Sequence, residues 1–309
     1  MTLPHSYLEY PLRRPGMDHD RYPYASLFKR KPVKWPNNAR VALVVVPLVE
    51  WYPLNMYENP AATKVPGGMD RPYPDYWNYT MRDYGTRVGI YRIFKMLDQL
   101  GMPASVAMNA SVGQRHPFLV KEVNRRGWEL MAHGQDASKV QHGGLKAGEE
   151  EALISESLAT LRKASGQPVT GWLSPLQSES MATIDILSRH GVQYTLDWNV
   201  DDLPVKMRGD GGAVYGMPYA LDVNDRLSVL DFNLSNDAYT EQLVDAFTTL
   251  WTEAEHSGGR MVTIAAHSWM SGQANRIGAL RRALEIMKSH TGVWATTYAE
   301  ALKAYKPQE

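Results

Sequence analysis

Val41-Ala-Leu-Val-Val-Val-Pro-Leu-Val-Glu50 is the stretch that decides the fold, because no charged residue interrupts it before its final glutamate. An uninterrupted β-branched run of this kind predicts a strand that is buried on both faces, as in a parallel sheet. The run is about half as long as a membrane-spanning helix. Glu50 then stands at the carboxyl end of a buried strand, where a carboxylate requires a partner.

Helices and strands alternate along the rest of the chain. Strands are predicted at residues 103–110, 128–132, 169–173, 192–198, 214–219, 261–267 and 293–295. Helices are predicted at residues 84–100, 116–127, 149–164, 180–190, 240–255 and 275–289, with a last one from Tyr298. This alternation indicates βαβ units in an α/β barrel. A doubly wound open sheet is the alternative, but no glycine-rich phosphate-binding loop follows any strand.

The expected domain organisation is an extended arm at residues 1–40 and a single barrel domain at residues 41–309. The arm is rich in proline, tyrosine, arginine and aspartate, and its aromatic residues should pack on the barrel or on a neighbouring subunit. Residues 51–80 are irregular and rich in proline and glycine. A long loop of this kind is typical of an insertion over a functional site.

The composition excludes several classes of function. Lys+Arg 33 balances Asp+Glu 33, so the basic field that binds nucleic acid or anionic membranes is missing. The absence of cysteine excludes disulfides, a thiolate nucleophile and cysteine-based zinc sites. The first residues show no apolar signal-peptide core, so we expect a soluble, cytoplasmic protein that acts on a small molecule.

Polar side chains follow several predicted strands, at the barrel end where parallel α/β folds carry their chemistry. Glu50, His133 and His267 are the candidate catalytic residues, although each alone is equally a capping or structural residue. The candidate substrate-binding residues lie beside them or at neighbouring strand ends. They are Trp51, Asn109, Gln135, Asp136, Trp172, Asp197, Trp198, Asp201 and Trp269.

Five stretches, in order along the chain, carry a family resemblance. They are Asp83–Gly89, Arg126–Gly134, Gly191–Pro204, Pro218–Asp225 and Thr263–His267. With them the chain resembles the polysaccharide deacetylase superfamily from about Asn37 to Tyr305, and most closely its metal-independent branch of allantoinases and cyclic-imide hydrolases. The resemblance implies a deformed (β/α)7 barrel, often a homo-oligomer (dimer or tetramer). It also implies hydrolysis of an amide, imide or ureide C–N bond other than a peptide bond.

The resemblance also bears on a metal cofactor. True deacetylases place a metal-binding His or Asp four residues after the first histidine, and here that position is Ala137. A catalytic zinc needs three protein ligands, whereas Glu50 and His133 supply two, with Asp136 as a possible third. We therefore expect no cofactor, and water activated by a carboxylate or an imidazole. One divalent metal such as zinc is the alternative.

A second departure concerns the substrate. Allantoinase-like members carry an arginine shortly after a Gly-Trp pair, but here Gly171-Trp172 is followed by Leu173-Ser-Pro-Leu-Gln-Ser178. An electron-rich substrate oxygen would lose a bidentate partner there, which argues against allantoin itself. Neutral hydrogen bonds from Asn109, Ser111 and Gln114 are a possible replacement.

Three functional hypotheses follow. The first is a hydrolase of a small cyclic imide or ureide (allantoin-like) or of an amide. In it Glu50 or His133 activates water, and His267 protonates the leaving nitrogen or holds the carbonyl oxygen. The second is a metal-dependent N-deacetylase of a small acetylated amine or amino sugar. The third is a binding protein that has kept the barrel and lost the chemistry.

Overall fold

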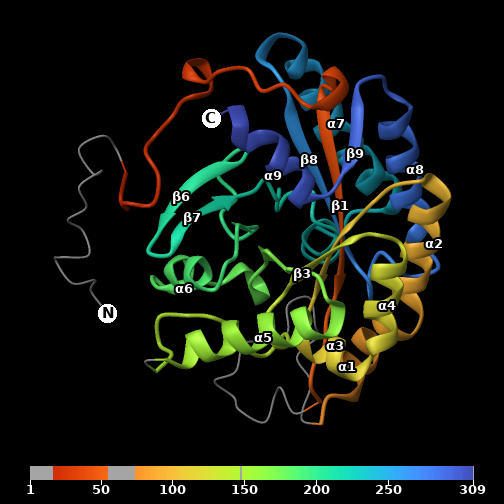
Figure 1. Ribbon diagram of the computed structural model, residues 1–309. Coiled ribbons are helices and arrows are strands. Elements are labelled where there is room, and N and C mark those ends of the chain that lie inside the picture. Colours follow the sequence, from red (N-terminus) through yellow and green to blue (C-terminus); the bar gives the residue numbers. More distant parts are fainter. Residues whose placement is uncertain (1–16, 55–73, 147, 309) are drawn as a thin grey trace.

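The computed structural model describes residues 17–54, 74–146 and 148–308, and within them all strands belong to one sheet (Figure 1). The strands are β1 (Val41–Val49), β2 (Ser105–Met108), β3 (Glu129–Ala132), β4 (Gly171–Trp172), β5 (Tyr194–Thr195), β6 (Val205–Gly209), β7 (Gly212–Gly216), β8 (Arg260–His267) and β9 (Val293–Thr296). Their order is β6-β7-β5-β4-β3-β2-β1-β8, and β9 pairs with the first half of β1. All pairs are parallel except β6 with β7, so the sheet is mixed.

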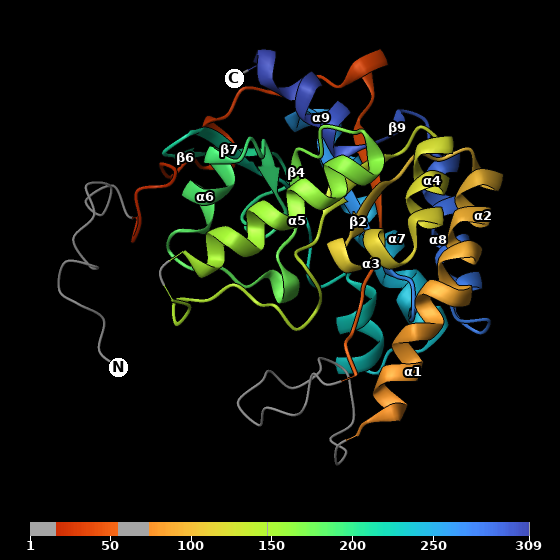
Figure 2. The ribbon, with the colours of Figure 1, turned by 60° about the horizontal axis from the view of Figure 1, so that its bottom comes forward.

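Helices cover the outside of this curled sheet, with α2, α4 and α8 along one flank (Figures 1 and 2). The helices are α1 (Tyr76–Tyr84), α2 (Ile90–Leu100), α3 (Ala110–Arg115), α4 (Pro117–Arg125), α5 (Glu149–Ser165), α6 (Thr183–Arg189), α7 (Asn236–Ser257), α8 (Ile277–Ser289) and α9 (Tyr298–Tyr305). A π-helical segment, Gly85–Gly89, joins α1 to α2, and a second one covers Leu227–Asp231. None of the helices in the described residues combines the length and apolarity that crossing a membrane requires.

The predicted alternation of strands and helices is confirmed, with three local differences. Helix α3 lies between a predicted strand and a predicted helix and was not expected. Helix α1 begins inside the stretch predicted to be irregular, of which residues 55–73 are outside the described part. Strand β6 was not predicted, because Lys206 and Arg208 alternate along it and leave only one buried residue, Met207. Charged side chains are typical of an edge strand, and β6 forms one edge of the sheet.

Strand β1 separates two apolar layers, which explains why all nine of its residues are buried. Alternate residues such as Val45 and Val49 belong to the layer beneath the helices, while Val44 and Val46 belong to the layer inside the barrel. Because side chains alternate across a strand, a run apolar at every position has to be covered on both faces.

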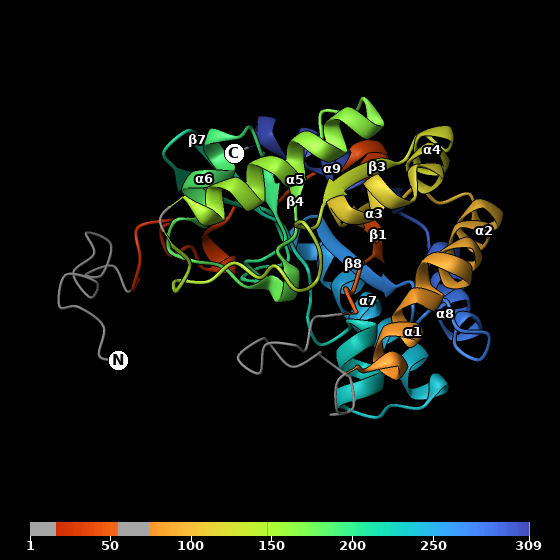
Figure 3. The ribbon, with the colours of Figure 1, turned by 90° about the horizontal axis from the view of Figure 1, so that it is seen from below.

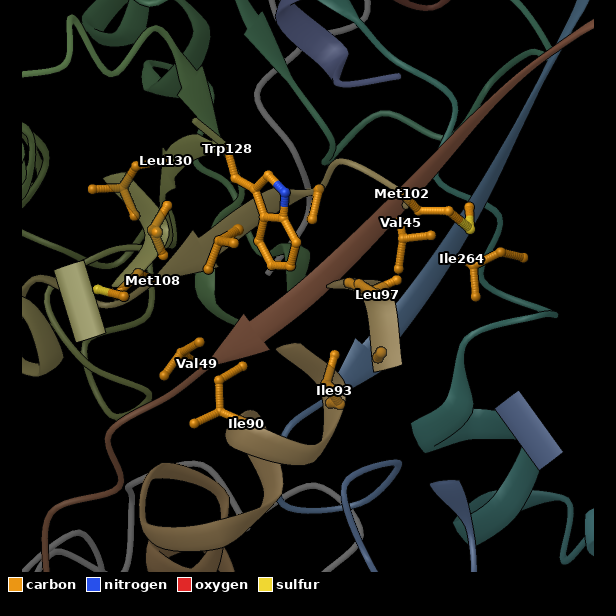
Figure 4. Close-up of a cluster of buried hydrophobic side chains, with 14 of the residues drawn as sticks. Val45, Val49, Ile90, Ile93, Leu97, Met102, Met108, Trp128, Leu130 and Ile264 are labelled. Atoms are coloured by element: carbon orange, nitrogen blue, oxygen red, sulfur yellow. The ribbon is translucent and has the colours of Figure 1, made fainter. Parts of the chain in front are cut away.

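Figure 4 shows the outer layer, where Val45 and Val49 of β1 meet Ile90, Ile93 and Leu97 of α2. These α2 residues recur three and four positions apart, and this spacing places them on one side of the helix. Helix α2 ends at Gly101, whose left-handed backbone (φ 60°) closes the last turn. The amphipathic pattern of α2 is therefore satisfied by the outer face of β1.

The sheet does not close by strand pairing between β8 and the β5–β7 side. Hydrogen bonds bridge this seam instead: the Met261 N–H donates to the Asp202 carbonyl at 3.1 Å, and Thr263 Oγ1 donates to the Pro218 carbonyl at 2.8 Å. The Tyr298 hydroxyl donates to the same Pro218 oxygen at 2.7 Å. The barrel is therefore open along one seam and closed there by side chains and loops.

The strand register brings the predicted catalytic residues to one level of the barrel. Leu48 pairs with His267, Val49 with Met108, and Met108 with Ala132. The residues that follow Val49 and Ala132 are Glu50 and His133, so both emerge beside His267. Figure 3 views the molecule from below, towards the end at which β1 finishes.

Candidate functional site

A cavity of about 300 Å³ lies at the carboxyl ends of β1, β3 and β8, and Glu50, His133 and His267 all line it. The structure therefore brings the three candidate catalytic residues to one place. Three larger hollows, of about 670, 690 and 450 Å³, are lined by other parts of the described chain and include none of these three side chains. We place the candidate active site in the smaller cavity because it alone combines these titratable groups.

Glu50 is a buried carboxylate with a donor on each oxygen. Its Oε1 accepts a hydrogen bond from the Tyr52 hydroxyl at 3.0 Å, and its Oε2 accepts one from the Trp269 indole at 2.8 Å. His133 Nε2 lies 3.6 Å from Oε1. Burial raises the pKa of Glu50, but the neighbouring imidazoles and the indole outweigh it and hold this pKa at about 2. Glu50 is therefore an anion at neutral pH.

His133 is oriented from both of its ends. Its Nδ1 lies 2.8 Å from the carbonyl oxygen of Leu173, and since a carbonyl only accepts, Nδ1 carries a proton. Nε2, which faces Glu50, is then the nitrogen that can take up or release a proton. The Asn109 side chain links the backbone that follows β1 to the backbone that follows β3. Its Oδ1 accepts from the Trp51 N–H at 2.7 Å, and its Nδ2 donates to the His133 carbonyl.

His267 forms a buried pair with Asp225. Its Nδ1 donates to Asp225 Oδ1 at 2.6 Å, while Oδ2 accepts from the His267 backbone N–H at 2.8 Å and from the Ser271 hydroxyl at 2.6 Å. Burial lowers the pKa of His267, but the charge and hydrogen bond of Asp225 and the charge of Glu50 raise it by more. The pair leaves Nε2 for the cavity, which is the arrangement of a general acid or base held by a carboxylate.

The two groups that donate to Glu50 are themselves supported by a cation. The guanidinium of Arg82 lies 4.7 Å from the ring centroids of both Tyr52 and Trp269. A cation over an aromatic face is attracted by the ring quadrupole, and burial strengthens the attraction. Arg82 is 2% exposed, so this stack fixes the two rings and, through them, the Glu50 carboxylate.

Several residues that line or support the cavity were missed from the sequence. They are Tyr52, Ser174, Gln177, Asn224, Asp225 and Arg226. Asp225 and Arg226 follow a loop and not a strand, so a search at strand ends passes over them. The signal for Asp225 lay in the Pro218–Asp225 stretch, which contributes to the family resemblance but was given no role.

The candidate substrate-binding residues that follow Glu50 and His133 in the sequence do not line the cavity. Trp51 packs on Tyr79 and His116 at centroid distances of 6.5 and 6.0 Å. The Gln135 carbonyl accepts the Ser111 N–H at 3.0 Å. Asp136 Oδ1 accepts from Ser138 N–H and hydroxyl at 2.8 and 2.6 Å. With Asn109, these residues shape the loops around the site.

The remaining candidates support the site or belong to other surfaces. The Trp172 indole donates to the Ser174 hydroxyl, and Asp197 accepts from the Ser174 N–H, each at 2.8 Å. Trp198 donates to Glu179 at 2.7 Å and lines the 690 Å³ hollow. Asp201 pairs with Arg30. Trp269 donates to Glu50 but is not itself one of the residues that line the cavity.

The described residues do not fit a metal centre with three protein ligands. Across them, no group of three or more His, Asp or Glu side chains is placed to hold a metal ion. Asp136, the possible third ligand, is bound to Ser138, and the buried Ala137 has no donor atom. We therefore derive no chemical step through a metal.

Comparison with known proteins agrees with this fold. Residues 77–195 match the family model for polysaccharide deacetylase. The matched residues include His133, whereas Glu50 and His267 lie outside them.

Several known proteins are similar to this chain over nearly all of its length. A polysaccharide-deacetylase-like protein of Schizosaccharomyces pombe is 24% identical over 89% of the chain and 94% of its own length. The structure of a polysaccharide-deacetylase-like protein from Pseudomonas aeruginosa PAO1 has a TM-score of 0.81 at 22% identity, covering 91% of this chain and 96% of that one. The PuuE allantoinase structure has a TM-score of 0.79 at 25% identity, covering 93% and 98%. The predicted deformed (β/α)7 barrel is thereby confirmed.

Proposed function

We propose that this protein is a hydrolase that cleaves a C–N bond in a small amide, cyclic imide or ureide by base-activated water. The observation that carries the proposal is the convergence of Glu50, His133 and the Asp225-held His267 on one cavity of about 300 Å³. A cavity of that size suits a small substrate better than a polymer. The similarity to both a deacetylase-like structure and an allantoinase structure supports chemistry at a carbonyl–nitrogen bond.

In the proposed first step, His133 takes a proton from water while the water oxygen attacks the substrate carbonyl carbon. The Nδ1–H bond to Leu173 leaves Nε2 as the basic nitrogen, and the Glu50 anion stabilises the imidazolium that forms. Glu50 itself is a poor proton acceptor, because its pKa of about 2 lies far below neutral pH.

In the second step, His267 donates the Nε2 proton to the leaving nitrogen as the C–N bond breaks. The raised pKa of His267 supports this role, because the imidazole stays protonated to higher pH than a free histidine. Asp225 keeps the ring oriented and the imidazolium stable. The products are a carboxylic acid and the protonated leaving group, which is an amine from an amide, an amide from an imide and a urea from a ureide. In a cyclic substrate both products remain on one molecule.

A second candidate is the N-deacetylation of a small acetylated amine or amino sugar. The match of residues 77–195 to the polysaccharide deacetylase family model favours it. The same cavity and the same two histidines would serve, with acetate as the acid product. Release of acetate distinguishes this reaction from ring opening.

The test is hydrolysis of allantoin, hydantoin, succinimide, dihydrouracil and N-acetylglucosamine by the purified protein, with and without a chelator. We expect turnover of at least one compound, unchanged by the chelator and lost in His133→Ala. Loss of activity with the chelator, together with one divalent metal per chain by elemental analysis, would instead support the metal-dependent deacetylase. If none is hydrolysed, or if His133→Ala retains full activity on a substrate found later, the proposal is wrong.

A further inference from the structure

The wall of the candidate active site carries one positive side chain that the mechanism above does not use. Among the described residues that line the cavity, Arg226 is the only lysine or arginine, and Glu50 is the only aspartate or glutamate.

Arg226 is held in place at its backbone while its guanidinium stays available. Its N–H donates to the Asn224 side chain at 2.9 Å at the start of the turn that leads into Leu227–Asp231. The guanidinium forms an ion pair with Asp231 at 3.5 Å, and the two side chains are 24% and 40% exposed. An exposed ion pair at this distance contributes little free energy, so a ligand anion can replace Asp231.

Glu50 would repel an anionic ligand, so the cavity needs a compensating cation if its ligand is an acid. Arg226 and His267 line the same cavity of about 300 Å³, so one small molecule can contact both side chains. A guanidinium binds a carboxylate through two parallel hydrogen bonds, which fixes the orientation of the ligand as well as its charge.

The rest of the wall sets the shape of the ligand. Leu176 and Leu221 line the cavity and are 42% and 38% exposed, which places apolar surface at its mouth. Gln177 and Asn224 add neutral hydrogen-bonding groups. A ligand with a short apolar body, an amide or imide at one end and an acid at the other would match this lining.

We propose that Arg226 binds a carboxylate of the substrate, so that the substrates of this protein are small amides, imides or ureides that carry a carboxylate away from the scissile bond. This inference rests on the proposed hydrolase function and deepens it by naming the substrate class. Arg226 is thus a specificity-determining residue, and it takes no part in proton transfer.

The experiment compares acids with neutral analogues of nearly the same shape. The pairs are dihydroorotate with dihydrouracil, hydantoin-5-acetate with hydantoin, and N-acetylglycine with N-acetylethanolamine. Steady-state kinetics and calorimetric binding are measured for the wild type, Arg226→Gln and Arg226→Lys. Arg125→Gln is the matched control, because Arg125 is 61% exposed on α4 and lies outside the cavity lining.

We expect the wild type to prefer the acid in at least one pair, and Arg226→Gln to raise the KM for that acid about ten- to hundred-fold, the range for a lost charge-assisted hydrogen bond. The kcat for the acid and the KM for its neutral analogue should stay within about three-fold. The KM of Arg226→Lys for the acid should lie between those of the wild type and Arg226→Gln, and the KM of Arg125→Gln should equal that of the wild type. A melting curve for each variant ensures that only folded protein is compared.

The inference is overturned if Arg226→Gln affects an acid and its neutral analogue equally, or if the wild type does not distinguish them while hydrolysing the neutral compound. In either case the hydrolase proposal survives. If acids bind the wild type, lose binding in Arg226→Gln and are never hydrolysed, the hydrolase proposal fails while the role of Arg226 stands. Absence of both binding and turnover in all three pairs counts against both.

Discussion

At the scale of single residues, the groups around Glu50 determine the chemical role of its carboxylate. Both carboxylate oxygens have donors, Tyr52 and Trp269, and two imidazoles lie nearby. A carboxylate that is fully bonded and strongly acidic acts through its charge more than by accepting a proton. Its task in the proposed mechanism is to stabilise positive charge on His133 and His267.

Replacement of Glu50 by glutamine should therefore remove this charge and impair catalysis. We expect kcat to fall by at least about a hundred-fold, the range for loss of a preorganised charged group. The protein should also be less stable by about 1–3 kcal/mol, because the new amide cannot accept from both Tyr52 and Trp269. The measurements are kcat on a hydrolysed substrate and urea unfolding. Glu285→Gln, at a 49% exposed position on α8, is the control and should change neither.

Asp225 sets the ionisation of His267, which gives a prediction about pH. Its charge raises the pKa of His267 in the folded protein, so a reaction that needs protonated His267 loses rate as the pH rises through that pKa. Asp225→Asn removes the charge, so the loss of rate on the alkaline side of the pH–rate profile, its alkaline limb, should begin at lower pH. Ser271→Ala removes a hydrogen bond to Asp225 but keeps the charge, so its limb should stay near the wild-type position.

The same pair contributes stability that depends on pH. Because the pKa of His267 is raised from its ordinary value of 6.5, the contribution is fully present below pH 6.5 and is lost as the pH rises through the folded pKa. Unfolding measured across this range should show the loss in the wild type and a flatter profile in Asp225→Asn. An identical pH profile for both proteins would contradict the assignment of Asp225 as the partner.

Prediction from the sequence was strongest where a residue ends a buried strand. Glu50, His133 and His267 were found in this way, and they do share one cavity. Asp225 and Arg226 were not found, because their positions depend on how a loop folds back over the barrel, and no local pattern encodes that. Trp172 and Asp197 were placed at the right level of the barrel, but they do not line the cavity, and their side chains bond to Ser174, which does.

At the scale of elements, the helix pair α1–α2 is fixed against the loop that follows β8. Within the π-helical segment Gly85–Gly89, Gly89 lies against the backbone of Ser268, next to His267. A Cβ on Gly89 would overlap the Ser268 carbonyl oxygen, so only glycine permits this approach. The helices thereby help to set the position of His267 and Trp269.

Gly89→Ala should push this loop away from the helices. We expect a loss of about 1–3 kcal/mol in the free energy of unfolding, as for overpacking of a core, and lower activity because His267 moves. Gly278→Ala on α8 is the matched control. The nearest atom to its added Cβ, Arg282 Nη1, is 3.7 Å away, so a gain of up to about 1 kcal/mol in helix propensity is expected. Equal stability of the two variants in urea unfolding would argue against a rigid contact at Gly89.

Most helices and strands could be predicted from the spacing of their apolar residues and from the glycines and prolines at their ends. Helix α2 showed apolar residues at helical spacing up to Gly101, and β1 and β8 were continuous apolar runs. Helix α1 was missed because prolines and glycines dominate the residues before it. Strand β6 was missed because three of its five residues are charged or glycine.

At the scale of the whole molecule, the barrel depends on the hydrogen bonds across its open seam. The Pro218 carbonyl accepts from both Thr263 and Tyr298, which themselves lie 2.8 Å apart, oxygen to oxygen. Each donor can satisfy this buried oxygen if the other is removed. The seam should therefore tolerate the loss of either hydroxyl alone, but not the loss of both.

Thr263→Val and Tyr298→Phe should each destabilise the protein by about 0.5–1.5 kcal/mol, the net value of one hydrogen bond. The double variant should lose more than the sum, because the Pro218 oxygen is then buried without a donor. Denaturant unfolding of all four proteins measures this coupling. Strict additivity of the two losses would show that the seam is not held by a shared acceptor.

β1 ends at Val49, whereas two of the strands that cover it, β8 and β9, begin only at Arg260 and Val293. β1 therefore leaves the ribosome long before these strands exist, and unpaired apolar strands associate readily with other chains. We therefore expect β1 to be prone to aggregation in nascent chains that do not yet contain β8. A messenger that terminates before Arg260 should yield aggregated polypeptide rather than a smaller, partly active barrel.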